Sequence, residues 1–88
     1  MNPTTEMNLD DLRRIMAECA GEEEGIDLTG DIRDTAFIDL GYDSLALMES
    51  AARIKREFGV AIADDDLAQL ETPRAVLDVV NRALAVPR

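Results

Sequence analysis

The segment LGYDSLALMES, residues 40–50, holds the side chains of this chain that are best placed to do chemistry. Ser44 offers a hydroxyl between an acid, Asp43, and an apolar helical pattern that begins at Leu45. Serine is a favoured N-cap residue, so Ser44 either caps a helix or carries an attached group. Gly41 permits a tight turn just upstream, which presents the hydroxyl outward. The positive end of the following helix dipole suits a phosphate bonded to the serine oxygen.

The residues of a self-contained enzyme are missing around this serine. The chain has no histidine, which removes the usual general base and triad orienter. Cys19 is the only cysteine, so it can form neither an internal disulfide nor a zinc cluster. It lies on an apolar helical stripe with Ile15 and Met16, which predicts a buried structural thiol rather than a reactive one. DLTGDIRD and ADDDL lack the ligand spacing of a calcium loop, and we expect no metal site.

Composition indicates one small globular domain, residues 1–88, with 47% hydrophobic and 32% charged residues. The net charge of −10 disfavours nucleic acid and anionic membranes as partners, because both attract the opposite sign. No apolar run approaches the ~20 residues of a membrane span, and the N-terminus has no signal-peptide character. We therefore expect a cytoplasmic protein.

The hydrophobic pattern predicts an all-α fold. Residues 7–20 repeat apolar side chains at three- and four-residue steps, with Asn8 as a candidate N-cap and Gly21 as the end. Residues 21–43 form a long ordered loop, with one helical turn near 35–39. Its apolar side chains, among them Phe37 and Ile38, are expected to pin it to the core. Connections of this length in compact domains tend to be functional.

The strongest helical pattern covers residues 44–58. One apolar face consists of Leu47, Ala51, Ile54 and Phe58, and a second line contains Leu45 and Met48. Glu49 with Arg53, and Arg53 with Glu57, are expected to form ion pairs four residues apart. Gly59 ends the helix as a left-handed residue.

Two further helices follow, a short one at 65–70 and a longer one at about 73–85. Thr72 is the expected N-cap of the last helix, and Pro73 occupies its first position, where a missing N–H has no consequence. The predicted fold is a small bundle of three main helices plus one short helix, with a long ordered loop between the first two.

With the elements in place, GYDSL resembles the phosphopantetheine attachment motif of acyl carrier proteins, in which the serine of D-S-L bears the prosthetic arm. ECAGE at 18–22, GYDSLALMES at 41–50 and TPRAVLD at 72–78 resemble, more narrowly, the carriers of bacterial type II aromatic polyketide synthases. The resemblance implies that 4'-phosphopantetheine from coenzyme A is attached covalently to Ser44, within a motif that includes Gly41 and Asp43.

The resemblance also implies a non-catalytic, monomeric shuttle for malonyl units and growing polyketide chains held as thioesters, in antibiotic biosynthesis. The implied partners are a phosphopantetheinyl transferase, a malonyl transferase, the ketosynthase/chain-length factor, a ketoreductase and cyclases. By matching positions, the partner-recognition residues are Asp43, Leu45, Met48 and Glu49. Arg53 is added because of the charge of its helix.

One departure and three alternatives remain. Fatty-acid carriers have an acidic second helix, whereas residues 44–58 hold two acids and three bases, a net charge of +1. The long loop and the start of this helix are therefore expected to attract partners, with Arg53 or Arg56 excluding wrong synthases. A fatty-acid carrier is one alternative. A peptidyl carrier is another, against which Asp43 argues because such carriers favour Gly-Gly-x-Ser. An acidic helical adaptor without a prosthetic group is the third.

Overall fold

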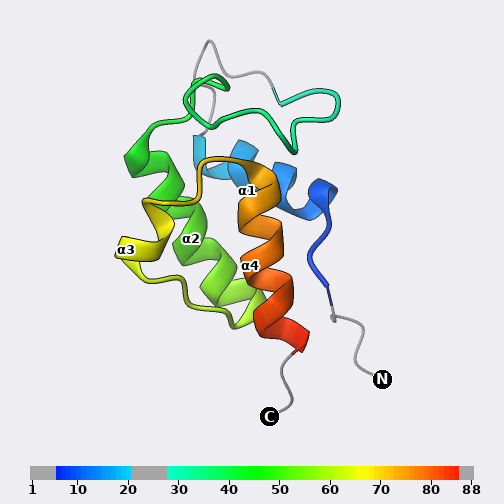
Figure 1. Ribbon diagram of the computed structural model, residues 1–88, viewed down its shortest axis with the longest axis vertical. Coiled ribbons are helices and arrows are strands. Elements are labelled where there is room, and N and C mark those ends of the chain that lie inside the picture. Colours follow the sequence, from blue (N-terminus) through cyan, green and yellow to red (C-terminus); the bar gives the residue numbers. More distant parts are fainter. Residues whose placement is uncertain (1–5, 21–27, 86–88) are drawn as a thin grey trace.

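The computed structural model describes residues 6–20 and 28–85, and these ranges contain four helices and no strand. The helices are α1 (Leu9–Ala20), α2 (Ser44–Phe58), α3 (Asp64–Leu67) and α4 (Pro73–Ala85). In Figure 1, α2 and α4 run in the same direction along the long axis, the short α3 lies beside α2, and α1 crosses behind them. The predicted all-α bundle is confirmed. Its short helix begins one residue earlier than expected and ends three residues sooner.

Capping side chains mark the starts of α1 and α4, and a glycine marks the end of α2. Asn8 Oδ1 accepts from the Asp11 N–H at 2.8 Å, and the Asp11 carboxylate accepts from the Asn8 N–H at 3.1 Å, a reciprocal cap that starts α1. Thr72 Oγ1 accepts from the N–H three residues later at 3.3 Å and caps α4. Gly59 ends α2 with φ of 74°. These predicted caps are confirmed, and Gly21 lies outside the described residues.

The core is built from the three long helices and from the loop that precedes α2. Its buried apolar residues are Met7, Leu12, Ile15, Met16, Ile32, Phe37, Leu40, Tyr42, Ile54, Val60, Val76, Leu77 and Val80. The loop therefore contributes four core side chains and is part of the packed structure. Ile38 is a correction to the prediction, because its side chain faces solvent.

The loop is tied to the start of α4 by hydrogen bonds. The Phe37 N–H donates to the Glu71 carbonyl, and the Arg74 N–H donates to the Arg33 carbonyl, both at 2.8 Å. The Arg74 guanidinium also binds the two carboxylate oxygens of Asp34, at 2.6 and 2.9 Å, and lowers the pKa of that carboxyl. These contacts fix the position of the loop relative to α4, and hence the place at which the chain enters α2. A hydrogen-bonded turn over residues 36–41 corresponds to the turn predicted near 35–39.

Ion pairs join α1 to α2 on the outer surface. Glu57 accepts from Arg14 at 2.7 Å and pairs with Arg53 at 3.5 Å, while Arg53 also binds Glu18. The Arg53–Glu57 prediction is confirmed. The Glu49–Arg53 prediction is wrong, because the guanidinium is directed to the acids of α1 and the last turn of α2 instead. Within residues 6–20 and 28–85, no helix has both the length and the apolar character to span a bilayer.

Candidate functional site at the start of α2

Asp43, not Ser44, caps α2. Asp43 has extended backbone, with φ of −90° and ψ of 176°, and its Oδ1 accepts from the Ala46 N–H at 2.8 Å. Its carbonyl accepts the first helical hydrogen bond, from the Leu47 N–H at 3.0 Å. Ser44 is therefore the first residue inside the helix. The alternative in which Ser44 serves only as an N-cap is wrong, because the neighbouring carboxylate already fills that role.

The Ser44 hydroxyl is consequently free for other uses. The residue is exposed, and no hydrogen bond to its side chain forms among the residues that the structure describes. Gly41, with φ of 81°, turns the chain immediately before the site. The N–H groups of Ser44 and Leu45 precede the first helical hydrogen bond and mark the positive end of α2. An anionic group on the serine oxygen would meet these donors, partly opposed by the charge of Asp43.

A groove of about 540 Å³ opens beside the serine. Its walls come from the loop, the first turns of α2, and α3 with the link that follows it: Ala36, Phe37, Ile38, Tyr42, Asp43, Ser44, Leu47, Met48, Asp64, Leu67, Ala68, Leu70 and Glu71. Most of these side chains are apolar. The volume lies within the range of small-molecule sites, about 300–1,000 Å³. A flexible chain attached at Ser44 therefore has an apolar groove within reach.

Large apolar side chains are exposed near the site. Leu45 is 65% exposed and Met48 is 47% exposed, as expected for residues off the core face of α2. Ile38, which sequence reasoning assigned to the core, is 83% exposed and also lines the groove. Its position one residue after buried Phe37 in a helical turn rotates its side chain about 100° away from that of Phe37, and this spacing was the available signal. We call Ile38, Leu45 and Met48 the apolar rim.

Two other predicted recognition residues, Glu49 and Arg53, differ in their exposure and in their ion pairing. Glu49 is exposed and has no ion pair within the described part of the chain. Arg53 is engaged by Glu18 and Glu57, and only 27% of its side chain is exposed.

Cys19 is partly exposed at the edge of the core, not fully buried as predicted. No cluster of three or more potential metal ligands forms within residues 6–20 and 28–85.

A buried polar contact below the site was not anticipated from the sequence. The Tyr42 hydroxyl lies 2.8 Å from the Met16 carbonyl of α1 and 2.7 Å from Ser50 Oγ of α2. Tyr42 and Ser50 are 4% and 2% exposed. Burial raises the pKa of Tyr42 to about 12, against a smaller lowering by the Ser50 hydrogen bond. The pairing was missed because a serine within an otherwise helical surface pattern looks like an ordinary polar position.

Comparison with known proteins agrees with this geometry. The family model described as the phosphopantetheine attachment site matches residues 10–80. The granaticin polyketide synthase acyl carrier protein of Streptomyces violaceoruber is 61% identical over 90% of this chain and 93% of its own. The actinorhodin counterpart of Streptomyces coelicolor is 56% identical over 92% and 94%. The solved holo form of the actinorhodin carrier superposes with a TM-score of 0.81, at 53% identity over 94% and 96% of the two chains.

The fold and the matched family define a carrier domain for phosphopantetheine. Within that class, the chain belongs to the acyl carrier proteins of type II polyketide synthases. Such proteins are carrier subunits and do not catalyse reactions themselves. The start of α2 fits the prosthetic group, because it combines an exposed hydroxyl, amide donors that the helix leaves unused, and an adjoining groove of ligand size. The fatty-acid alternative is less well supported, since the relatives above belong to polyketide synthases.

Proposed function

We propose that Ser44 Oγ is the atom to which the phosphopantetheine arm of this carrier is attached. The observation that carries the proposal is the division of roles between neighbours. Asp43 supplies the cap of α2, and the Ser44 hydroxyl at the first helical position is left exposed, with no hydrogen-bond partner in the described part of the chain. Ser50, the other serine of the chain, is buried and hydrogen-bonded. Only one serine is therefore accessible to a modifying enzyme.

The attachment is a phosphoryl transfer from coenzyme A. Ser44 Oγ attacks the phosphorus that bears the pantetheine, an O–P bond forms, and the bond to the adenosine bisphosphate leaving group breaks. The serine proton passes to the transferase or to solvent. When bound, the group supplies a terminal thiol that holds acyl chains as reactive thioesters. This chain contributes a capped helix start that holds Ser44. The flexible arm attached there would raise the local concentration of the acyl group at each partner.

We further propose that the cargo consists of malonyl units and growing polyketide chains, carried by residues 1–88 as one monomeric domain in the cytoplasm. The proposed partners are a phosphopantetheinyl transferase, a malonyl transferase, the ketosynthase/chain-length factor, a ketoreductase and cyclases. The groove beside Ser44 supports brief shelter of an acyl chain, because its walls are mostly apolar.

The surface around Ser44 supports a docking role. The apolar rim projects beside the acids Asp43 and Glu49, and exposed apolar groups next to charge are typical of interaction sites. We propose that Leu45 and Met48 contact partners directly, while Asp43 and Glu49 attract basic patches. The role of Arg53 is more constrained, because its guanidinium would have to leave Glu18 and Glu57 to reach a partner.

The attachment site is tested by intact mass after incubation with coenzyme A and a promiscuous phosphopantetheinyl transferase. The parent is expected to gain the mass of one arm, and S44A is expected to gain none. S50A is the matched control, since it removes the only other serine and should still gain the mass of one arm once the reaction is complete. Loading of S44A, or failure of the parent, would contradict the proposal.

The cargo is tested separately with the loaded protein. Malonylated carrier is offered to a type II polyketide ketosynthase/chain-length factor and to a fatty-acid ketosynthase at equal concentrations. Faster turnover by the polyketide enzyme is expected. Preference for the fatty-acid enzyme would favour the fatty-acid alternative and leave the attachment site untouched.

A further inference from the structure

The three groups Tyr42, Ser50 and the Met16 carbonyl form a buried hydrogen-bonded chain that connects α2 to α1 directly beneath the candidate site. Met16 O can only accept, so the single phenolic proton of Tyr42 is donated to it. The Ser50 hydroxyl must then donate to Tyr42 Oη. The number of available protons therefore sets the direction of these hydrogen bonds: Ser50 donates to Tyr42, and Tyr42 donates to the Met16 carbonyl of α1.

Tyr42 is the side chain that anchors this junction. Among residues 41–46 it alone is buried, and Ser44 lies two positions further on. The Asp43 cap joins α2 only to itself, so it does not fix the helix start relative to the rest of the bundle. The Tyr42 ring also lies against Phe37, with ring centres 6.1 Å apart, and the Tyr42 N–H donates to the Phe37 carbonyl at 2.9 Å. Tyr42 thus joins the turn at residues 36–41 to α1, through its backbone N–H and ring on one side and its hydroxyl on the other.

We propose that Tyr42 and Ser50 are positioning residues for arm attachment. Their hydrogen bonds to α1 hold the start of α2 so that Ser44 Oγ keeps one location relative to the surface on which the transferase docks. Both side chains are buried, so their effect on Ser44 is transmitted through the start of α2. This inference rests on the proposed attachment at Ser44 and adds the means by which that atom is kept in place. Small misplacements of a reacting atom are sufficient to slow a transfer step.

The test compares Y42F, S50A and the double variant with the parent. Y42F keeps the buried ring and removes both hydrogen bonds, whereas S50A removes one. With a saturable transferase assay, we expect kcat for Y42F to fall about three- to tenfold with KM within about twofold, because docking side chains are unchanged. S50A should fall less. The double variant should match Y42F, since Ser50 acts through the phenol.

Amide exchange supplies a second readout that a general loss of stability does not reproduce. The N–H groups of Tyr42, Ala46 and Leu47 should exchange at least about fivefold faster in Y42F, because each of the two lost hydrogen bonds contributes about 1 kcal/mol. N81A is the matched control. It removes the two hydrogen bonds, at 2.6 and 2.9 Å, that join Asn81 of α4 to the Met7 backbone. In N81A, α4 amides should exchange faster while the junction keeps the parent rate.

The outcomes separate this inference from the function on which it rests. If Y42F and S50A are loaded with the parent kcat and show parent exchange at the junction, the positioning role is overturned and Ser44 remains the site. A parent that takes no arm contradicts the attachment itself. If Y42F does not fold, S50A decides the question, because it retains the hydrogen bond from Tyr42 to Met16. Loading of N81A as slow as that of Y42F would also contradict the inference.

Discussion

At the scale of single residues, the site depends on two neighbours with different tasks. Asp43 satisfies the helix start, and Ser44 is thereby left with an exposed hydroxyl. Both serine and aspartate are favoured at N-caps, so sequence alone left the choice between them open. The structure decides it, because the extended backbone falls at Asp43 and Ser44 is already helical.

Substitution of Asp43 separates its capping role from its charge. D43A should lower the free energy of unfolding by about 1 kcal/mol, within the 0.5–2 range for a lost N-cap. D43N keeps a good capping oxygen and should stay within a few tenths of the parent. Urea unfolding measures both. If the transferase recognises the charge, D43N loses loading rate at nearly unchanged stability, whereas equal loading of D43N and parent excludes a charge role.

The buried phenol of Tyr42 predicts a loss of stability in alkaline solution. Its pKa is raised to about 12 in the folded protein, against about 10 in an unfolded chain. The stability linked to this group is therefore complete below about pH 10 and is lost as pH rises toward 12, by about 1–2 kcal/mol.

Unfolding followed from pH 8 to 11.5 checks this expectation, with Y42F as the control. The parent should lose stability more steeply than Y42F above pH 10. Because Tyr42 is the only tyrosine and tryptophan is absent, phenolate absorbance reports on this residue alone. Parallel pH profiles of the two proteins would show that the phenol contributes nothing to the pH dependence.

At the scale of elements, the helices were predictable and the side-chain partners between them were not. α2 and α4 match the predicted ranges because local signals define them: a strong apolar period, Thr72 with Pro73 at one start, and Gly59 at one end. The exposure of Ile38 and the burial of Ser50 are set by how the loop and α1 pack against α2. That packing involves segments far apart in the sequence, so the spacing of residues within one segment does not predict it.

The same limit affects Arg53, which sequence reasoning paired with Glu49 and offered for partner selection. In the structure it lies between Glu18 and Glu57, while Arg56 is exposed. R53E would place a third acid beside those two and should lower Tm, with R56E near the parent value. Thermal unfolding at low salt distinguishes them. A Tm for R53E equal to that of R56E would mean that these ion pairs contribute nothing to stability.

R56E is then the cleaner test of synthase selection. Since Arg56 has no structural partner to lose within the described chain, a change in its turnover by different ketosynthases reflects docking. We expect R56E to gain activity with a fatty-acid ketosynthase. If the activity with the fatty-acid ketosynthase is unchanged, the charge of Arg56 plays no part in the selection of the synthase.

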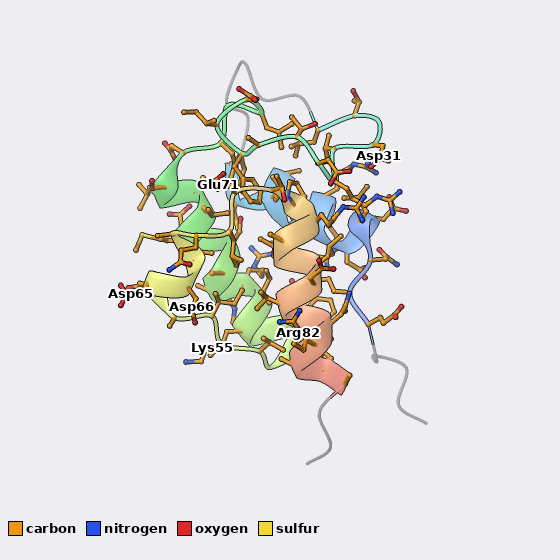
Figure 2. All side chains as sticks on the ribbon, viewed as in Figure 1. Asp31, Lys55, Asp65, Asp66, Glu71 and Arg82 are labelled. Atoms are coloured by element: carbon orange, nitrogen blue, oxygen red, sulfur yellow. The ribbon has the colours of Figure 1, made fainter. Side chains whose placement is uncertain are left out.

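At the scale of the whole molecule, charge is unevenly distributed. Figure 2 shows Asp31 and Glu71 toward one end and the bases Lys55 and Arg82 toward the other, with Asp65 and Asp66 on α3 at the flank. Figure 1, drawn in the same view, shows that α2 begins at the end where Figure 2 labels Asp31 and Glu71. Asp43, Asp64 and Glu71 also line the groove beside Ser44, so acids surround the candidate docking surface. Of the acidic segments in the sequence, residues 22–24 lie outside the described residues.

The net charge of −10 predicts that salt stabilises the protein. Mutual repulsion of the acids opposes the compact state, and at ~0.1 M salt the screening length is about 10 Å. Tm should therefore rise by several degrees between about 10 mM and 200 mM NaCl; relief of about 1 kcal/mol corresponds to roughly 4–8 °C for a domain of this size. Scanning calorimetry measures it. A constant Tm would mean that attractive ion pairs already balance the repulsion.

The central claim, that Ser44 bears the arm, is tested most directly by locating the added mass on the chain. Fragmentation mass spectrometry of the loaded parent assigns the phosphopantetheine to a single residue. Every fragment with the extra mass is expected to contain Ser44, and fragments that hold Ser50 without Ser44 are expected to be unmodified. An arm found on any other residue would contradict it.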